Sequence, residues 1–248
     1  MRSTFWSTRA WARWWVMGMT LGLLSACQSP ATLQGAGAPT LEQLFPGWKP
    51  SPVLGKRWQP FESVIQDGAP GMAVQTDASL SLLRTRFQTP VTTPSTVHFS
   101  WWVQDLVEGA DLSDTQASDA PAQLAVAFDG DRSALSARFG MMSELTLLVT
   151  GDALPYASLV YVWAAGDEHP VGTVIRDPRT DRIRYLVVEQ GPAHLRRWVH
   201  HTRDVHADYR RAFDEEPGPI LGLALMSDAD NTRGHTRAVF GPVSLQPR

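Results

Sequence analysis

The sequence is poor in the residues that mark several common protein classes. Cysteine occurs once, at Cys27, so neither a disulfide framework nor a multi-cysteine zinc site can form within one chain. Lysine occurs only at Lys49 and Lys56, and beyond the first 26 residues 19 basic residues stand against 25 acidic ones. Phosphate recognition needs a basic stripe, so we expect no nucleic-acid partner.

Common catalytic signatures are also missing. The sequence contains no GxSxG nucleophile elbow and no HExxH metal motif. Four histidines lie close together in the sequence, but His200 and His201 are adjacent and would point to opposite faces of a strand. We interpret this segment as a solvated, arginine-rich edge, and we expect no metal and no cofactor. The four histidines are His194, His200, His201 and His206.

The first 26 residues have the pattern of a secretory signal peptide. Three arginines, Arg2, Arg9 and Arg13, precede an apolar run over residues 14–26. This run is too short for a membrane-spanning helix, which needs about 20 residues. A basic flank, a short apolar core and small residues before a break together indicate a signal for export.

The break in this signal falls at Cys27. The tripeptide before it, LSA, resembles the lipobox of bacterial lipoproteins. The resemblance implies that the Cys27 sulfur becomes diacylated, with acyl chains such as palmitate, and that the mature chain covers residues 27–248. Gln28 in place of an aspartate implies sorting to the outer membrane, with the protein facing the periplasm. The membrane is therefore an expected partner, bound through the lipid.

The mature chain is predicted to be one domain behind a short tether. Residues 27–40 are small, polar and uncharged, as in a flexible linker. Residues 41–248 contain nine short segments with the alternation and flanking turn residues of strands. The nine segments are 71–76, 79–87, 96–103, 123–128, 158–164, 172–175, 182–189, 220–226 and 236–240.

Two segments, 132–151 and 204–218, have the apolar spacing of helices instead. Because long helices do not alternate with every strand, a doubly wound parallel sheet is excluded. We expect a mainly β fold, an antiparallel two-sheet sandwich of the jelly-roll kind with two helical insertions. The apolar stripe of the first insertion is Leu135, Phe139, Met142, Leu145 and Val149. The second begins at an N-cap, Asp204, and its apolar face is Val205, Tyr209, Ala212 and Phe213.

The pleating of strands assigns individual side chains to faces. Trp101 shares one face of its strand with apolar residues, whereas Trp102 and His98 point to the other, polar face. An exposed tryptophan beside polar residues suits stacking on a sugar, so Trp102 and His98 are candidate ligand-binding residues. The alternative is that another element of the fold covers Trp102. Farther along the chain, Gly222 and Ala224 leave room on one strand face for a bulky neighbour or for a ligand.

Carboxylates at strand ends offer a second kind of site. Glu189 ends one predicted strand, and Asp228 and Asp230 follow another. If these ends were neighbours, Glu189 with Asp228 or Asp230 could form the acid and nucleophile pair of a glycoside hydrolase. Acids at strand ends are also ordinary turn chemistry, which is the interpretation that we favour.

The loop SDADNTRGH, residues 227–235, raises the question of calcium. An EF-hand loop needs an acid at its twelfth position, and the twelfth residue counted from Asp228 is Val239. A sparser calcium site that uses Asp228, Asp230 and Asn231 stays open. Because aspartate and asparagine bond their own backbone in turns, we interpret the run as a structural loop between two strands.

Several motifs in the second half of the domain form one pattern. They are WW at 101–102, SDAPAQLAVAFDGD at 118–131, YVW at 161–163, LVVEQG at 186–191, Trp198, RDVHADYRRAF at 203–213 and LMSDADNTRGHTRAVFGPVSL at 225–245. This pattern resembles a bacterial family known only as domain of unknown function 3047. The resemblance implies a secreted, β-rich domain and supplies no activity.

Three functions remain open at this point. The first, which we favour, is a lipid-anchored module of the cell envelope that binds or organises without catalysis, with cell-wall glycan as a candidate ligand. The second is a hydrolase that acts on envelope glycans through the carboxylate pair. The third is a structural partner of another envelope protein.

Replacing the lipobox cysteine tests the predicted anchor. Cys27→Ser removes the sulfur that would carry the lipid, so the variant should be neither diacylated nor processed. Acyl chains contribute about 0.8 kcal/mol per buried CH₂, so their loss should be decisive for membrane binding. Fractionation combined with mass spectrometry of the N-terminus gives the answer. A wild-type chain with an unmodified Cys27 would contradict the prediction.

Overall fold

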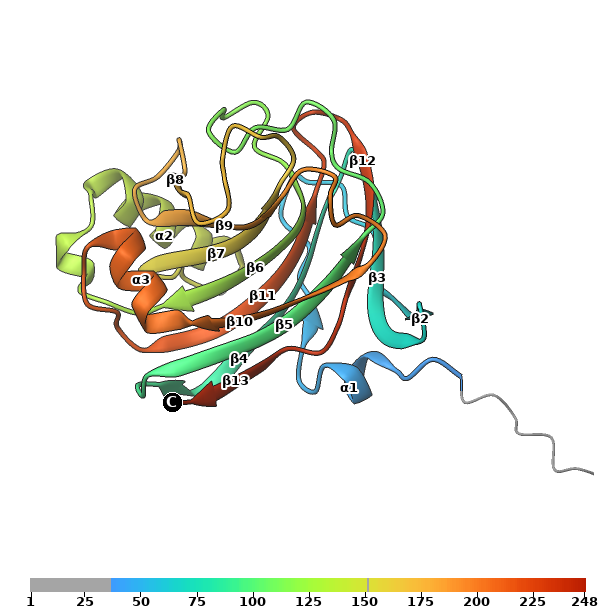
Figure 1. Ribbon diagram of the computed structural model, residues 1–248. Helices are drawn as coiled ribbons and strands as arrows, with labels where there is room; N and C mark the ends of the chain where they lie inside the picture. Colours follow the sequence, from blue (N-terminus) through green and yellow to red (C-terminus); the bar gives the residue numbers. More distant parts are fainter. Residues whose placement is uncertain (1–36, 151) are drawn as a thin grey trace, which may run out of the picture. The chain divides into compact units, whose positions relative to one another are not determined.

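The computed structural model describes residues 37–150 and 152–248 (Figure 1). These described residues belong to one compact unit. The predicted signal peptide, the lipidation site Cys27 and most of the tether lie outside the described residues. None of the described helices is long and apolar enough to cross a membrane.

Thirteen strands make up most of the described chain. They form a seven-stranded sheet with the order β1-β4-β11-β6-β7-β9-β8 and a six-stranded sheet with the path β10-β5-β12-β3-β2, in which β13 also pairs with β5. The strands are β1 Lys49–Pro50, β2 Glu62–Gln66, β3 Ala69–Asp77, β4 Leu80–Val91, β5 Ser95–Val103, β6 Ala120–Phe128, β7 Ala157–Ala164, β8 Val174–Arg176, β9 Ile183–Gln190, β10 Trp198–Asp204, β11 Ile220–Asp228, β12 His235–Phe240 and β13 Ser244–Pro247. The helices are α1 Leu41–Leu44, the 3₁₀ turn Arg132–Ala134, α2 Ala137–Thr150 and α3 Val205–Phe213.

This arrangement confirms the expected mainly β sandwich. Every strand pair is antiparallel except β7 and β9, which run parallel. All nine predicted strand segments are strands, and the four that sequence patterns missed are β1, β2, β10 and β13. β10 was missed because its residues WVHHTRD alternate too weakly in polarity to indicate a strand.

The two sheets enclose one main hydrophobic core. The alternation of β5 places Val97, Phe99, Trp101 and Val103 inside, as predicted. Across the interior, the Phe99 ring stacks on Tyr161 of β7 with centroids 5.6 Å apart, and Trp101 lies 6.4 Å from Trp163. These aromatic side chains span the space between the sheets and fix which face of each strand points outward.

Helix α3 closes one end of the sandwich and contacts strands of both sheets, β5, β9 and β10 (Figure 1). Asp204 caps it as predicted, because its carboxylate accepts from the Ala207 backbone N–H at 3.0 Å. Val205 and Tyr209 are fully buried, and the Tyr209 ring lies 4.5 Å from Phe128. The apolar face of α3 is therefore part of the core.

Helix α2 differs from its prediction. A helix does form over Ala137–Thr150, but its apolar stripe is not covered. Phe139 is buried, whereas Met142 is 42% exposed and Leu145 is 60% exposed. The side chain of Val149 lies outside the described part of the chain. Helical spacing predicts a helix but not the partner that would bury its apolar face.

Strand β10 points a half-buried histidine, His201, toward the core. As predicted for neighbours in a strand, His200 is exposed and His201 points inward. The His201 ring stacks 4.9 Å from Phe99 and lies 5.1 Å from Trp101, and its Nε2 has no hydrogen-bond partner. Burial, together with the nearby charge of Arg203, lowers the pKa of His201 to about 4. A neutral imidazole is therefore part of the folded state.

This histidine should make the fold sensitive to acid. An unfolded histidine has a pKa of about 6.5, so the stability that comes from a neutral His201 is present above pH 6.5 and is lost as the pH falls toward 4. Between pH 7.5 and pH 4.5, His201→Phe should therefore lose about 1–3 kcal/mol less unfolding free energy than the wild type does. Urea unfolding at pH 7.5 and pH 4.5 gives the difference. His200→Gln, on the exposed face of the same strand, should retain the wild-type difference. An equal pH dependence in His201→Phe and wild type would rule the explanation out.

Candidate functional site

A groove of about 200 Å³ lies on the outer face of the seven-stranded sheet. Its floor consists of small side chains from three adjacent strands, β11, β6 and β7, and its rim is formed by β4 and by residues 152–155. The floor residues are Ala125, Ala127, Ser158, Gly222 and Ala224. Small residues in register across three strands leave a shallow, flat surface.

The local backbone explains part of this floor. A Cβ atom at Gly222 would lie 2.3 Å from the carbonyl oxygen of Thr85, so only glycine fits beside β4 at this point. The register of β11 shifts between Ile220 and Gly222, which brings the two backbones together. The space predicted at Gly222 is thus occupied by the neighbouring strand, and the space at Ala224 is open to the groove.

The rim of the groove is charged. The Arg84 guanidinium binds the carboxylate of Asp152 at 2.5 Å, and Arg86 pairs with the other oxygen of the same carboxylate. The Arg84 contact holds the pKa of Asp152 below its usual range. Lys49 of β1 lies opposite Arg84 in the strand register and therefore on the same sheet face. Arg84 and Arg86 outnumber the single carboxylate of Asp152, so this rim carries a net positive charge in an otherwise acidic protein.

A cluster of carboxylates lies at the other end of β11. Asp119, which precedes β6, approaches Asp228 and Asp230 so that one oxygen of each lies within 4.8 Å of the others. Asp119 accepts from the backbone N–H groups of Asn231 and Thr232, at 3.1 and 2.8 Å. Sequence reasoning found Asp228 and Asp230 but not Asp119 as a site residue, because their proximity depends on the pairing of β6 with β11.

Burial makes it unfavourable for the carboxylates of this cluster to be ionised. Asp228 is 8% exposed and Asp119 is 1% exposed. Burial, together with the charges of Asp119 and Asp230, raises the pKa of Asp228 to about 8. The ammonium of Lys56 binds Asp230 at 2.5 Å, and its charge opposes the rise in the pKa of Asp228.

The structure does not make the strand end of Glu189 a neighbour of Asp228 or Asp230, which was the condition for the alternative carboxylate pair. Strands β6 and β7 lie between β9 and β11, so three strand spacings, about 14 Å in total, separate the two strand ends. Glycoside hydrolase pairs lie about 5–9.5 Å apart. Glu189 instead forms a 2.6 Å contact with Nδ1 of His194 in the loop that follows β9.

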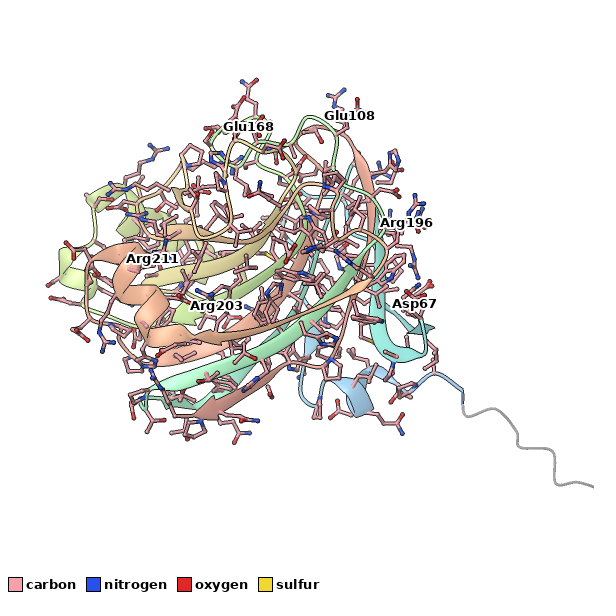
Figure 2. All side chains as sticks on the ribbon, viewed as in Figure 1. Asp67, Glu108, Glu168, Arg196, Arg203 and Arg211 are labelled. Atoms are coloured by element: carbon pink, nitrogen blue, oxygen red, sulfur yellow. The ribbon has the colours of Figure 1, made fainter. Side chains whose placement is uncertain are left out.

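Trp102 does not provide the exposed surface that the sequence suggested. It points to the outer face of the six-stranded sheet, as its strand position predicts, but it is only 6% exposed. Its indole N–H donates at 2.7 Å to Asp67, which Figure 2 shows at the β2–β3 turn, and the Arg237 guanidinium lies over the ring, 5.5 Å from its centroid. His98, on the same sheet face, contacts Thr202 at 3.0 Å. Neither side chain lines the groove.

A second buried ion pair has a structural role. Arg203, which Figure 2 shows on β10, binds Asp208 of α3 with two hydrogen bonds of 2.8 and 2.6 Å. Tyr161 donates to the same carboxylate at 3.1 Å. Both carboxylate oxygens are therefore paired, and the contacts attach α3 to both sheets.

These motifs agree with a family assignment. A family model described as protein of unknown function (DUF3047) matches residues 46–244. The chain belongs to this family. The resemblance seen in the sequence motifs is thereby confirmed. A search of curated proteins finds no match.

Solved structures of similar architecture include carbohydrate-binding modules and glycoside hydrolases. The family 11 carbohydrate-binding module of Clostridium thermocellum, in complex with a mixed-linked tetrasaccharide, is 9% identical, with a TM-score of 0.41 over 85% of this chain and 95% of that one. Endoglucanase 3 of Trichoderma harzianum is 8% identical, with a TM-score of 0.43 over 82% and 91%. The family 12 xyloglucanase of Bacillus licheniformis is 7% identical, with a TM-score of 0.41 over 81% and 99%. Similarity at this level assigns neither a ligand nor a reaction.

The burial of Trp102 changes what its substitution should do. Trp101→Ala should cost about 3–5 kcal/mol of unfolding free energy, as expected for a buried aromatic side chain. Because Trp102 is also buried and hydrogen-bonded, Trp102→Ala should cost a comparable amount. Chemical unfolding of both variants measures this. A Trp102→Ala variant as stable as wild type would show that the ring is more accessible than its contacts indicate.

Proposed function

We propose that this chain is a lipid-anchored binding module of the cell envelope that holds a segment of an anionic glycan in the groove of the seven-stranded sheet. The observation that carries the proposal is the combination of a flat, small-residue floor with a cationic rim. Sugar rings present flat C–H faces and polar edges. The flat floor can pack against the C–H face of a sugar ring, and the charged rim can bind its polar edge.

The charge of the rim favours an anionic saccharide. None of the described residues that line the groove is aromatic, so ring stacking is not available to hold a neutral sugar there. Arg84 and Arg86 present planar guanidinium groups, which bind carboxylate, sulfate or phosphate groups with paired hydrogen bonds. Their present partner, the Asp152 carboxylate, shows that an anion fits between them. A ligand anion would bridge or replace that contact.

The predicted anchor places this groove near the envelope. Only 13 residues lie between the predicted lipidation site, Cys27, and the start of α1 at Leu41. A module on so short a tether samples the space beside the membrane surface, where cell-wall glycan is a candidate ligand. The proposal that the protein faces the periplasm from the outer membrane rests on the lipobox motif.

A structural partner function is the second candidate, and it has a different observation in its favour. Met141, Leu145 and Leu148 of α2 are 68%, 60% and 83% exposed. Spaced four and three residues apart, they lie on one helix face, as in helices that pack against another protein. This face lies outside the groove lining, so the two functions can be tested separately.

Binding assays on residues 28–248 test the glycan proposal. Calorimetry with muropeptide or uronic-acid oligosaccharides should show binding, and neutral oligosaccharides of equal length should bind more weakly. Arg84→Ala and Arg86→Ala should each weaken binding about 10–100-fold, because each removes a charge-assisted contact of about 1.5–3 kcal/mol. Ala127→Trp should block the groove from its floor.

Arg57→Ala is the matched control. Arg57 is exposed, lies outside the groove, and only approaches Asp77 at 3.9 Å, so its loss should leave affinity unchanged. Equal affinity for neutral and anionic sugars, or binding that survives Ala127→Trp, would contradict the proposal. Loss of a protein partner in a Leu145→Glu variant with intact glycan binding would support the structural role as well.

A further inference from the structure

Three carboxylates from two separate segments converge at the end of β11. One oxygen each of Asp119, Asp228 and Asp230 lies within 4.8 Å of the others. Two oxygen ligands of one calcium ion lie at most about 5 Å apart, because each Ca–O distance is about 2.3–2.6 Å. The spacing of the three carboxylates therefore allows all of them to contact a single ion.

The hydrogen bonds of this cluster leave one buried oxygen without a partner. The side chain of Asp230 is 9% exposed, and its Oδ2 binds Lys56, but its Oδ1 is buried and has no hydrogen-bond partner. An unsatisfied carboxylate oxygen costs more than a neutral polar atom, so such an atom requires an explanation. A cation between the carboxylates would satisfy it.

The charges of the cluster are also unbalanced. Asp119, Asp228 and Asp230 carry three negative charges when ionised, and Lys56 compensates one of them. A divalent cation would neutralise the remainder. By contrast, the buried Asp208 elsewhere in the protein is fully paired with Arg203 and Tyr161.

We propose that Asp119, Asp228 and Asp230 bind a calcium ion that joins the start of β6 to the loop between β11 and β12. The ligands are hard carboxylate oxygens with no sulfur or imidazole, which favours calcium over zinc. Magnesium is less suited, because it demands shorter distances and retains most of its water. The loop that the sequence suggested was only a turn would then be a turn that also binds metal.

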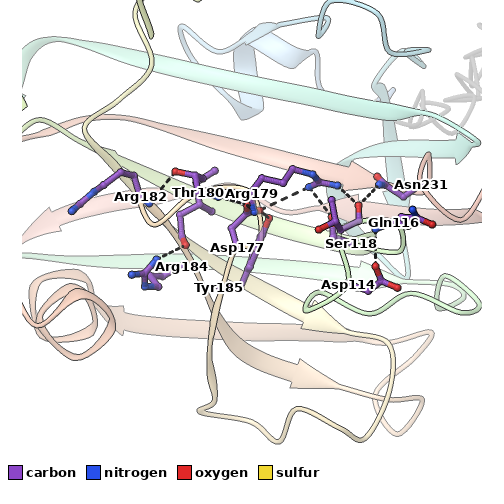
Figure 3. A network of polar contacts seen from close by, with 12 residues as sticks. Asp114, Gln116, Ser118, Asp177, Arg179, Thr180, Arg182, Arg184, Tyr185 and Asn231 are labelled. Carbon is purple, nitrogen blue, oxygen red and sulfur yellow. Dashed lines mark hydrogen bonds and ion pairs between the residues drawn. The ribbon is translucent and has the colours of Figure 1, made fainter. Parts of the chain in front are cut away.

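The surroundings hold this site in shape. The Asn231 amide donates to the carbonyl of Thr115 at 3.0 Å, and Arg179 donates to the same carbonyl and to Ser118 (Figure 3). Asp177 accepts from Tyr185 at 2.9 Å beside this network. Contacts from the 114–118 segment, the β8–β9 turn and the 228–235 loop thus position Asp119 before any ion binds.

Thermal unfolding of the mature chain, residues 27–248, tests the proposal with calcium itself as the probe. After treatment with EGTA, calcium at about 100 times its Kd should raise Tm by about 5–10 °C. Calorimetry should show one calcium ion per chain, and magnesium at the same concentration should have a smaller effect. No calcium-dependent change in either Tm or heat would overturn the proposal.

Substitutions then locate the ion. Asp230→Asn should fold in EGTA and lose the calcium-dependent rise in Tm, and Asp228→Asn gives a second test should Asp230→Asn fail to fold. Glu62→Gln, at an exposed acid on β2, removes one charge that is not part of the cluster and should retain the full rise. A full calcium response in a folded Asp230→Asn or Asp228→Asn variant would place the ion elsewhere and refute the assignment.

Substitution of Lys56 provides a test in which calcium binding should become tighter instead of weaker. Lys56→Met removes the one cation that competes for Asp230, so it should tighten calcium binding about 10-fold if the ion and the ammonium share that carboxylate. A purely structural role of the loop predicts the reverse, a loss of stability that calcium does not restore. Unchanged calcium affinity in Lys56→Met would argue against Asp230 as a ligand.

Discussion

The packing of β5 against β7 is the contact on which the rest of this structure depends. Phe99 and Trp101 from one sheet meet Tyr161 and Trp163 from the other, and both tryptophans are fully buried. Large aromatic side chains contribute more to a core than other residues do, and their positions fix the alternation of the strands that carry them. Once these faces point inward, Ala125, Ala224 and Arg84 must point outward, and the groove follows.

The same constraint explains where charge collects. A sandwich has little room for ionised groups between its sheets, so carboxylates occur at strand ends or in paired contacts. Asp208 illustrates a buried acid with complete hydrogen bonding. Asp228 and its neighbours illustrate the opposite case, in which repulsion between like charges persists within the fold. A requirement for stability alone does not explain why these carboxylates lie so close together.

The sequence was sufficient for features that depend on local patterns. Strand alternation placed Trp101 in the core and separated His200 from His201, and a short-range cap signal placed Asp204 at the start of α3. Features that depend on distant pairing were not predictable. The proximity of Asp119 to Asp230, the separation of Glu189 from Asp228 and the covering of Trp102 by Asp67 and Arg237 each follow from the order of strands in the sheets. The exposed face of α2 could not be foreseen, because periodicity describes a helix and not its surroundings.

The order of strands has a consequence for biosynthesis. β11, which begins at residue 220, lies between β4 and β6 near the middle of its sheet, and β5 is paired by β12 and β13 from the end of the chain. Neither sheet can be completed until nearly the whole polypeptide is available, and pairings so distant in sequence form slowly. A nascent chain of this topology stays unfolded while it is being made. Late folding of this kind suits the export that the N-terminal sequence predicts, because a chain can be threaded across a membrane only before its core closes.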